Sequence, residues 1–279
     1  MQLALEIGHR TDVGRRRDHN EDCVGVFRPH TPDEIHRRGT LLAVADGMGG
    51  YAAGEVASRT ALAATVNAYY GDLTGSIDTS LRRALTIAND AVRAEARQDS
   101  ERTGMGTTIA LAVICEGELL AANVGDSRVY LLRDGQLSQV SRDHSLVAAL
   151  LDEGKITAEE ARHHPHRNVI TRSIGGQPEV EVETYSARSL QDGDVVLICS
   201  DGLWGMVTPG QILELTQDSP AQDAADALIR AANEAGGHDN ITVIVCRVRQ
   251  LADEDDRTEQ IDALPLQLQD TQPIPRIEL

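Results

Sequence analysis

The sequence predicts an α+β fold in which a largely antiparallel sheet core is covered by helices. Apolar runs of strand length occur in blocks, and pairs of segments with helical spacing separate those blocks. This order differs from the strict alternation of strands and helices that is typical of a parallel sheet. The 279 residues can bury a substantial core, built mainly from Ala, Val, Leu and Ile because aromatic residues make up only 3%.

The first block of strands is followed by two helices. Branched and apolar residues predict strands at 3–7, 24–27 and 41–45, the last of them buried on both faces because its five residues are all apolar. At 54–70 and 80–96 the apolar spacing changes to three and four, which predicts two amphipathic helices.

Strands resume after these helices and then stop again. Runs at 107–115, 119–124 and 128–133 predict strands, and the Asp-Gly pair that follows predicts a hairpin turn into 136–140. Residues 145–185 break this pattern with a short helical run, a glycine stop and a capping-box sequence. We interpret 145–185 as an inserted flap.

The remaining elements complete one domain over residues 1–249. A strand at 195–199 and two helices at 209–216 and 221–234 lead into a final strand that ends near Arg249. Residues 250–279 hold 8 acidic and 2 basic residues, with three prolines and little periodicity. Such a segment is predicted to be a disordered acidic tail.

Charge and cysteine usage limit the function classes. A formal net charge of −18 argues against nucleic acid and against an anionic membrane surface as the main partner. No apolar segment approaches the ~18 to 20 residues needed to cross a bilayer, and the N-terminus does not resemble a secretory signal. The four cysteines lie far apart and are expected to be buried thiols in a reducing compartment. We therefore expect a cytoplasmic protein.

Asp46 stands at the end of the apolar run 41–45 and is followed by Gly47, Gly49 and Gly50. Without Cβ atoms, this backbone can turn sharply and bring carbonyl oxygens close to whatever the carboxylate binds. A lone Asp-Gly pair is usually only a turn. Here the pattern recurs, which indicates a cation site.

Carboxylates beside glycine occur at several other predicted strand ends. The full set of candidate ligands is Glu21, Asp22, Asp46, Asp126, Asp201 and Asp239. Carboxylates gathered from distant parts of a chain repel one another unless they are solvated apart or share cations. Oxygen ligands favour hard ions, Mn²⁺ or Mg²⁺. Two such ions generate a hydroxide nucleophile and support in-line displacement at phosphorus, and an arginine would grip the phosphate oxygens.

The chain resembles the bacterial form of the metal-dependent protein phosphatases of the PP2C type. Seven motifs occur in family order over residues 1–249. They are Arg17-Asp18-His19-Asn20-Glu21-Asp22, Asp46-Gly47-Met48-Gly49-Gly50, residues 54–58, Met105-Gly106-Thr107-Thr108, Asn123-Val124-Gly125-Asp126-Ser127-Arg128, Cys199-Ser200-Asp201-Gly202-Leu203 and Gly237-His238-Asp239-Asn240-Ile241-Thr242. The resemblance implies an α-β-β-α sandwich of two antiparallel sheets flanked by helix pairs. It also implies hydrolysis of phosphoserine and phosphothreonine in proteins, by attack of a hydroxide that bridges two metal ions.

The resemblance also implies roles for individual residues. Asp46 would bridge two core ions, with the Gly47 carbonyl on one of them. Asp201 and Asp239 would bind the other, and Glu21 and Asp22 would act directly or through water. Asp126, with Asp201, matches a third and weaker metal position, and Arg17 matches the phosphate-binding arginine. The expected partners are phosphorylated proteins, the substrates of a cognate Ser/Thr kinase, and we expect a monomer.

One departure from the eukaryotic pattern concerns the proton donor. Met48 stands where eukaryotic relatives carry a histidine, as it does in bacterial relatives. Three interpretations remain open. His144 is a candidate for the donor, it could instead be a structural histidine at the base of the flap, and metal-bound water is the third option.

Other classes fit the sequence less well. No cysteine has the Cys-x₅-Arg spacing of a thiol-dependent phosphatase, and the sole lysine, Lys155, does not lie in a phosphate-binding loop. No Asp-rich calcium loop with a closing Glu is present. A non-catalytic pseudophosphatase that binds phosphoproteins is the alternative, but it would be expected to have lost a metal ligand.

Overall fold

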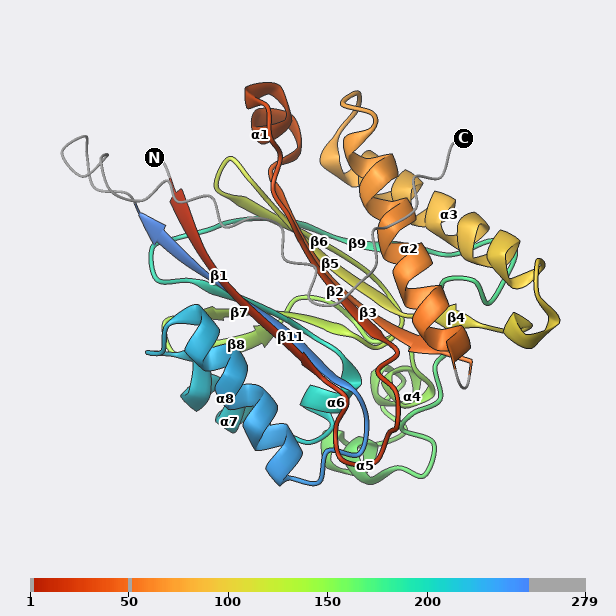
Figure 1. Cartoon of the computed structure of the whole chain (residues 1–279). Coiled ribbons are helices and arrows are strands. Elements are labelled where there is room, and N and C mark those ends of the chain that lie inside the picture. The colour runs from red at the N-terminus through yellow and green to blue at the C-terminus, as the bar shows by residue number, and fades with distance from the viewer. Residues whose placement is uncertain (1–2, 50–51, 251–279) are drawn as a thin grey trace.

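The computed structural model describes residues 3–49 and 52–250, and two antiparallel sheets form its centre (Figure 1). The first sheet has the strand order β1, β11, β10, β7, β8. Its strands are β1 (Leu3–Asp12), β7 (Arg128–Arg133), β8 (Gln136–Gln139), β10 (Val195–Cys199) and β11 (Ile241–Gln250). The predicted fold class, α+β with two antiparallel sheets, is confirmed.

The second sheet has the order β2, β3, β5, β6, β9, and the short strand β4 pairs with the end of β3. Its strands are β2 (Asp22–Phe27), β3 (Thr40–Met48), β4 (Gly106–Thr107), β5 (Ile109–Cys115), β6 (Glu118–Val124) and β9 (Glu183–Ser189). β3 is buried on both faces, as its unbroken apolar sequence predicts: Leu41 and Ala43 face the helices, and Leu42 and Val44 face the other sheet.

Helix pairs cover the outer faces of the sandwich. α2 (Ala52–Tyr70) and α3 (Ile77–Ala96) pack on the second sheet, and α7 (Pro209–Thr216) and α8 (Ala221–Glu234) pack on the first. The buried face of α3 carries Leu81, Leu85, Ala88 and Val92, which follow the three-and-four spacing of an amphipathic helix. The layers are therefore helix, sheet, sheet, helix.

Several elements differ from the sequence prediction. β3 continues through Asp46 to Met48, because Gly47 and Met48 pair with β4 instead of turning away. A short helix, α1 (Pro32–Arg38), was not predicted, although the Thr31–Glu34 capping box marks its start. Its seven residues lack an apolar stripe.

The predicted flap is shorter than 145–185. It contains α4 (Leu146–Asp152) and α5 (Ala158–His163), but residues from Glu183 onward form β9, the edge strand of the second sheet. We call residues 145–182 the insert.

The chain's last strand extends one residue beyond the predicted domain end. Gln250 closes β11 by pairing with Leu3, so it belongs to the first sheet and not to the tail. The rest of the predicted acidic tail, residues 251–279, lies outside the described residues. Within the described residues, none of the helices combines the length and the apolar character required to cross a membrane.

Candidate metal and phosphate site

The predicted carboxylates come from both sheets and meet at one end of the sandwich. Asp46 lies near the end of β3, and the ladder with β2 places Asp22 directly opposite it. Asp126 follows β6 of the second sheet, and Asp201 follows β10 of the first sheet. Asp239 lies two residues before β11. Strand geometry, not proximity along the chain, therefore gathers these side chains.

Two threonines hold the backbone of Asp46. The Asp46 amide donates to the Thr108 hydroxyl, and the Asp46 carbonyl accepts from the Thr108 amide and the Thr107 hydroxyl, at 2.8 to 3.1 Å. Both threonines are fully buried. These hydrogen bonds hold the backbone of Asp46 in place, and its side chain projects from this fixed point.

Glu21 lies beside Asp46 and packs against two glycines. The Glu21 carbonyl accepts from the Gly47 amide at 3.2 Å and from the Ser58 hydroxyl at 2.6 Å. A Cβ on Gly47 would come within 2.1 Å of the Gly54 carbonyl oxygen. Only glycine allows this approach.

Asp22 is 9% exposed and has one satisfied carboxylate oxygen. Its Oδ2 accepts from the Ser200 hydroxyl at 2.8 Å, while its Oδ1 is buried without a hydrogen-bond partner. Burial raises the pKa of Asp22 to about 7, and the charges of Asp201 and Asp239 add to this effect.

Asp126, which is buried, and Asp201, which is partly buried, also leave a carboxylate oxygen unpaired. Each has a buried Oδ1 without a hydrogen-bond partner. Burial, followed by the charge of Asp201, raises the pKa of Asp126 to about 8. Burial, followed by the charge of Asp239, raises the pKa of Asp201 to about 6. Asp201 is also the first residue of a short helix, α6 (Asp201–Trp204), which was not predicted.

Arg17 reaches this group of carboxylates from the loop after β1. Its Nη2 donates to Asp239 Oδ2 at 2.8 Å, and its side chain is 48% exposed. One face of the site is therefore open to solvent and carries a guanidinium group. Arg15 and Arg16 are exposed in the same loop, in agreement with the solvated-loop interpretation of these two residues.

These properties fit hard cations. An unpaired buried carboxylate oxygen costs free energy, and burial together with mutual repulsion raises the pKa of Asp46 well above its usual value. Divalent ions would satisfy the free oxygens and offset the repulsion. Among residues 3–49 and 52–250, no group of three or more His, Cys, Asp or Glu side chains is placed so that it could hold a metal ion without rearrangement. The oxygens of Asp22, Asp126 and Asp201 nevertheless provide the donor set that Mn²⁺ or Mg²⁺ prefers.

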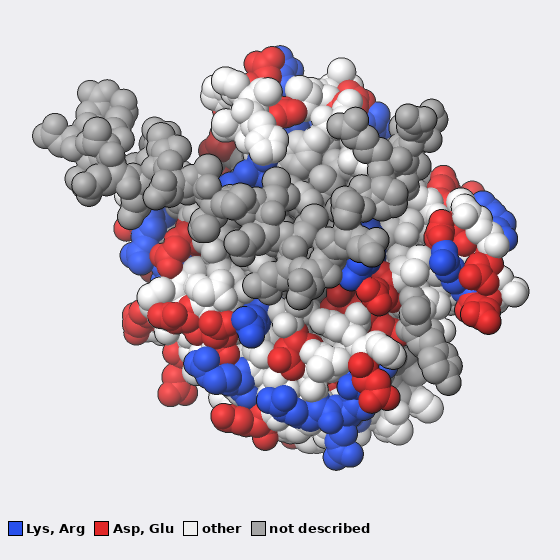
Figure 2. Space-filling model, in the orientation of Figure 1, with Lys and Arg blue, Asp and Glu red and all other residues white. Residues whose placement is uncertain are grey.

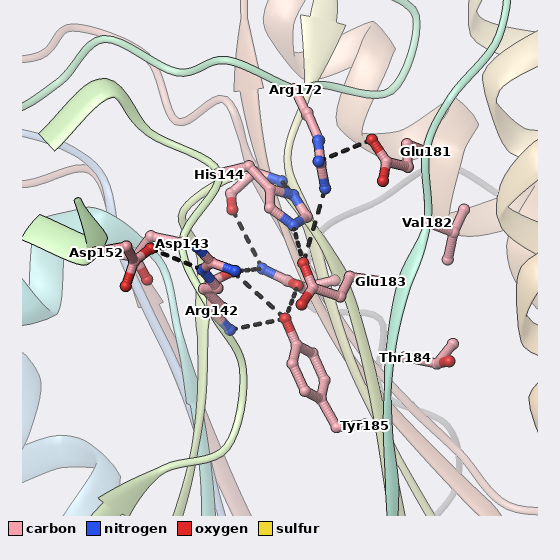
Figure 3. A network of polar contacts seen from close by, with 12 residues as sticks. Arg142, Asp143, His144, Asp152, Arg172, Glu181, Val182, Glu183, Thr184 and Tyr185 are labelled. Carbon is pink, nitrogen blue, oxygen red and sulfur yellow. Dashed lines mark hydrogen bonds and ion pairs between the residues drawn. The ribbon is translucent and has the colours of Figure 1, made fainter. Parts of the chain in front are cut away.

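His144 is not oriented as a proton donor to this site. It lies at the base of the insert, where Nδ1 accepts from the Gly125 amide at 3.1 Å and Nε2 lies 2.9 Å from Glu183 Oε2 (Figure 3). Because Nδ1 is an acceptor, the proton resides on Nε2 and points to Glu183. Burial also lowers the pKa of His144, which favours the neutral ring.

Several supporting residues were not identified from the sequence as site residues. Ser200 binds Asp22, and Asn240 accepts from the Glu21 amide and donates to the carbonyls of Val13 and His19. The Trp204 indole donates to the Asp126 carbonyl at 3.0 Å. Ser200 and Asn240 are adjacent in sequence to Asp201 and Asp239, and this adjacency is the signal that could have indicated them.

Known proteins are similar to this chain in sequence and in architecture. Residues 30–245 match the family model described as Protein phosphatase 2C. The serine/threonine phosphatase stp of Listeria monocytogenes is 40% identical over 241 residues, which are 85% of this chain and 93% of the relative. The serine/threonine protein phosphatase PstP of Mycobacterium tuberculosis is 41% identical over 246 residues, which are 88% of this chain and 45% of the relative.

Solved structures agree with these matches. The crystal structure of the Mycobacterium tuberculosis serine/threonine phosphatase PstP/Ppp has a TM-score of 0.78 at 40% identity, covering 88% of this chain and 99% of that chain. A structure of the PstP catalytic domain in complex with two manganese ions has a TM-score of 0.77 at 38% identity, covering 89% of this chain and 100% of that chain.

Proposed function

The chain belongs to the protein phosphatase 2C family, and we propose that it is a metal-dependent protein serine/threonine phosphatase. The observation that carries this proposal is the set of buried carboxylates with free oxygens beside the exposed guanidinium of Arg17. The family relatives named above are serine/threonine phosphatases, and one structural relative is a complex with two manganese ions.

The family resemblance implies which residues would hold the ions. Asp46 would be shared by two core ions, with the Gly47 carbonyl, Asp201 and Asp239 completing the set. Glu21 and Asp22 would act directly or through water, and Asp126 would form a weaker third position with Asp201. When bound, Mn²⁺ or Mg²⁺ lowers the pKa of water and offsets the negative charge of the phosphoryl group.

Arg17 would bind the phosphate oxygens of the substrate. Its planar guanidinium presents paired donors that match two oxygens of a phosphate. In the structure its Nη2 donates to Asp239 Oδ2, so Arg17 would exchange a carboxylate partner for the substrate. Its exposure allows a phosphorylated segment of another protein to reach it.

A catalytic function is favoured over a pseudophosphatase. Each predicted metal ligand is present and lies at the same end of the sandwich, in a chain about 40% identical to relatives named as phosphatases. Within the proposed function, the substrates are proteins phosphorylated by a cognate Ser/Thr kinase, the protein acts in bacterial signalling in the cytoplasm, and it works as a monomer.

The test is a phosphatase assay on phosphoserine and phosphothreonine peptides. The purified chain should release phosphate from both with Mn²⁺ and should lose this activity in excess EDTA. Asp46→Asn, which keeps the shape of the side chain, should be inactive and folded. Activity within tenfold of the Mn²⁺ rate in EDTA, or none in Mn²⁺, would overturn the proposal.

A further inference from the structure

We propose that His144 is a positioning residue that holds the Asp126 loop in place and joins it to the base of the insert. The contribution of Asp126 to metal binding rests on the proposed function. The contacts that place His144 in this role are properties of the described structure alone.

His144 binds the residue before Asp126 from two directions. Its backbone amide donates to the Gly125 carbonyl at 2.8 Å, and its ring Nδ1 accepts from the Gly125 amide at 3.1 Å. Gly125 has a φ of 109°, in the region that glycine favours, and a Cβ there would come within 2.6 Å of the Thr108 side chain. Both polar groups of this residue are therefore satisfied by His144.

Two other side chains complete the support of the loop. Asn123 Nδ2 donates to the Gly125 carbonyl at 3.1 Å, and the Trp204 indole donates to the Asp126 carbonyl at 3.0 Å. Trp204 is held in turn by the guanidinium of Arg128, whose central carbon lies 3.7 Å from the ring centroid. The Asp126 side chain contributes none of these bonds, and its Oδ1 remains free.

The same histidine also binds the first residue of β9, the strand that follows the insert. His144 Nε2 donates to Glu183 Oε2 at 2.9 Å, and Arg172 lies between Glu181 and Glu183, at 2.7 and 3.7 Å (Figure 3). The His144 side chain is 4% exposed, whereas Glu183 and Arg172 are about a third exposed. The contacts thus run from a buried loop to the surface.

A second set of contacts, next to the bond between His144 and Glu183, joins the Asp126 loop to β9. Tyr185 donates from its hydroxyl to Asn123 Oδ1 at 2.8 Å and accepts from the Arg142 amide at 2.7 Å (Figure 3). The Arg142 side chain forms an ion pair with Asp152 at the end of α4. Both sets therefore reach residues of the insert and residues of β9, the strand that follows it.

Residues of the insert also contact His144 and its neighbour Ser145 through the backbone. The Thr171 amide donates to the His144 carbonyl at 2.8 Å, and Ser145 forms a β-bridge with Ile170. A displacement of the insert therefore acts directly on the residue that orients Gly125. This geometry joins the insert to the loop that carries Asp126.

Two substitutions of His144 can each remove one of its ring hydrogen bonds, to Gly125 or to Glu183, and keep the other. The Asn side chain can place an oxygen where His has Nδ1, so His144→Asn should keep the bond to Gly125 and lose the bond to Glu183. The Gln side chain can place an amide where His has Nε2, so His144→Gln should keep Glu183 and lose the acceptor for Gly125. We expect the Gly125 amide to exchange hydrogen roughly tenfold or more faster in His144→Gln than in His144→Asn.

Metal binding gives the second measurement. In calorimetric titration with Mn²⁺, His144→Gln should weaken the weakest site by roughly 10-fold or more, as residues behind metal ligands commonly do, and leave the tighter sites unchanged. His144→Asn should retain the weak site. His163→Gln is the matched control, because His163 is exposed and pairs with Glu159 of its own helix.

The outcomes separate this inference from the proposed function. If the wild-type chain binds no Mn²⁺, the proposed function fails, while the exchange of Gly125 still decides the role of His144. Unchanged exchange of Gly125 in His144→Gln would overturn the inference. Equal loss at every Mn²⁺ site, with a lowered melting temperature, would also overturn it and would assign His144 a general structural role.

Discussion

At the scale of single residues, Asp126 shows how burial and ligand chemistry oppose each other. The residue is 1% exposed, and one of its carboxylate oxygens has no hydrogen-bond partner. A buried, unpaired charge destabilises the folded state unless a cation satisfies it. The conformation of this loop is set by the bonds to Gly125 and the Asp126 carbonyl, so the carboxylate itself is not required for folding.

Asp126→Asn should therefore stabilise the metal-free protein. Replacing the carboxylate removes the buried charge, which we expect to be worth on the order of 1 to 2 kcal/mol at pH 8, or a few degrees in melting temperature. Thermal unfolding in EDTA measures this directly. The same substitution should weaken the third Mn²⁺ site, and a lower melting temperature in EDTA would contradict the prediction.

Arg17→Ala should reduce kcat/KM on phosphopeptides. The loss should correspond to roughly 1.5 to 3 kcal/mol of transition-state stabilisation, the range for a hydrogen bond to a charged group. Arg17→Lys should restore part of the loss, because an ammonium group keeps the charge but not the paired donors. Arg16→Ala is the control, since Arg16 is exposed in the same loop. Equal losses in Arg16→Ala and Arg17→Ala would show that the register of this loop is wrong.

The sequence predicted the carboxylates that the strands bring together, but not the residues that support them. Asp46 and Asp201 could be predicted because glycine follows each of them at the end of an apolar run. The bond from Ser200 to Asp22 joins residues 178 positions apart. Such a contact depends on how two sheets face each other, and no local pattern specifies that.

At the scale of elements, the insert lies next to the predicted metal ligands. Thr107 of β4 exchanges backbone hydrogen bonds with Ile174, and β4 pairs with Gly47 and Met48 of β3. Figure 2 shows basic side chains gathered along the lower edge of the visible face, in the region where Figure 1 places α5 and the loop after β1. A phosphoprotein approaching the site would meet this edge.

Substitutions in the insert should therefore discriminate between substrates. Arg167→Ala should lower kcat/KM for phosphopeptides several-fold more than for a small aryl phosphate, because only the peptide is large enough to contact the exposed Arg167. Arg230→Ala, an exposed arginine on α8, is the control. Equal losses on both substrates would show that the insert supports the metal site instead of selecting substrates.

The elements that sequence reasoning missed are short or lie at an edge. α1 has seven residues and leaves Ile35 54% exposed, so no apolar stripe marks it. β9 is an edge strand whose polar sequence resembles a loop, and its pairing with β6 contains an irregularity between Leu119 and Ala121. The strands and helices with strong apolar patterns were predicted, with errors mainly at their ends.

At the scale of the whole molecule, the ladder of β1 with β11 extends to Gln250, the last of the described residues. Leu3 pairs with Gln250, so a chain that ends at Gln250 keeps the whole of this ladder. We expect it to retain its kcat on a small aryl phosphate and its melting temperature. A chain that ends at Val245 loses five of the pairs and should unfold at a lower temperature. A fall of several degrees on removing residues 251–279 alone would show that this segment stabilises the domain.

The clustered carboxylates should also make the stability of the metal-free protein fall as the pH rises. Their pKa values are raised on folding, to about 7 for Asp22 and about 8 for Asp126. A raised carboxylate pKa favours folding below the unfolded value and opposes it as pH rises through the folded value. His9 and His144 act in the other direction, because burial lowers their pKa values, but their effect falls below about pH 6.5.

In EDTA the melting temperature should therefore fall between pH 6.5 and pH 8.5, a window in which the two carboxylates lose protons in the folded state only. The expected change in the free energy of unfolding is on the order of 1 to 3 kcal/mol. With saturating Mn²⁺ the trend should reverse, because protons compete with the metal for the same oxygens. Asp126→Asn should flatten the EDTA profile at its alkaline end, whereas Asp223→Asn, an exposed carboxylate on α8, should leave it unchanged. A melting temperature in EDTA that rises across this window would mean that the carboxylates are stabilised as anions without metal, and the cation site would then lose its physical basis.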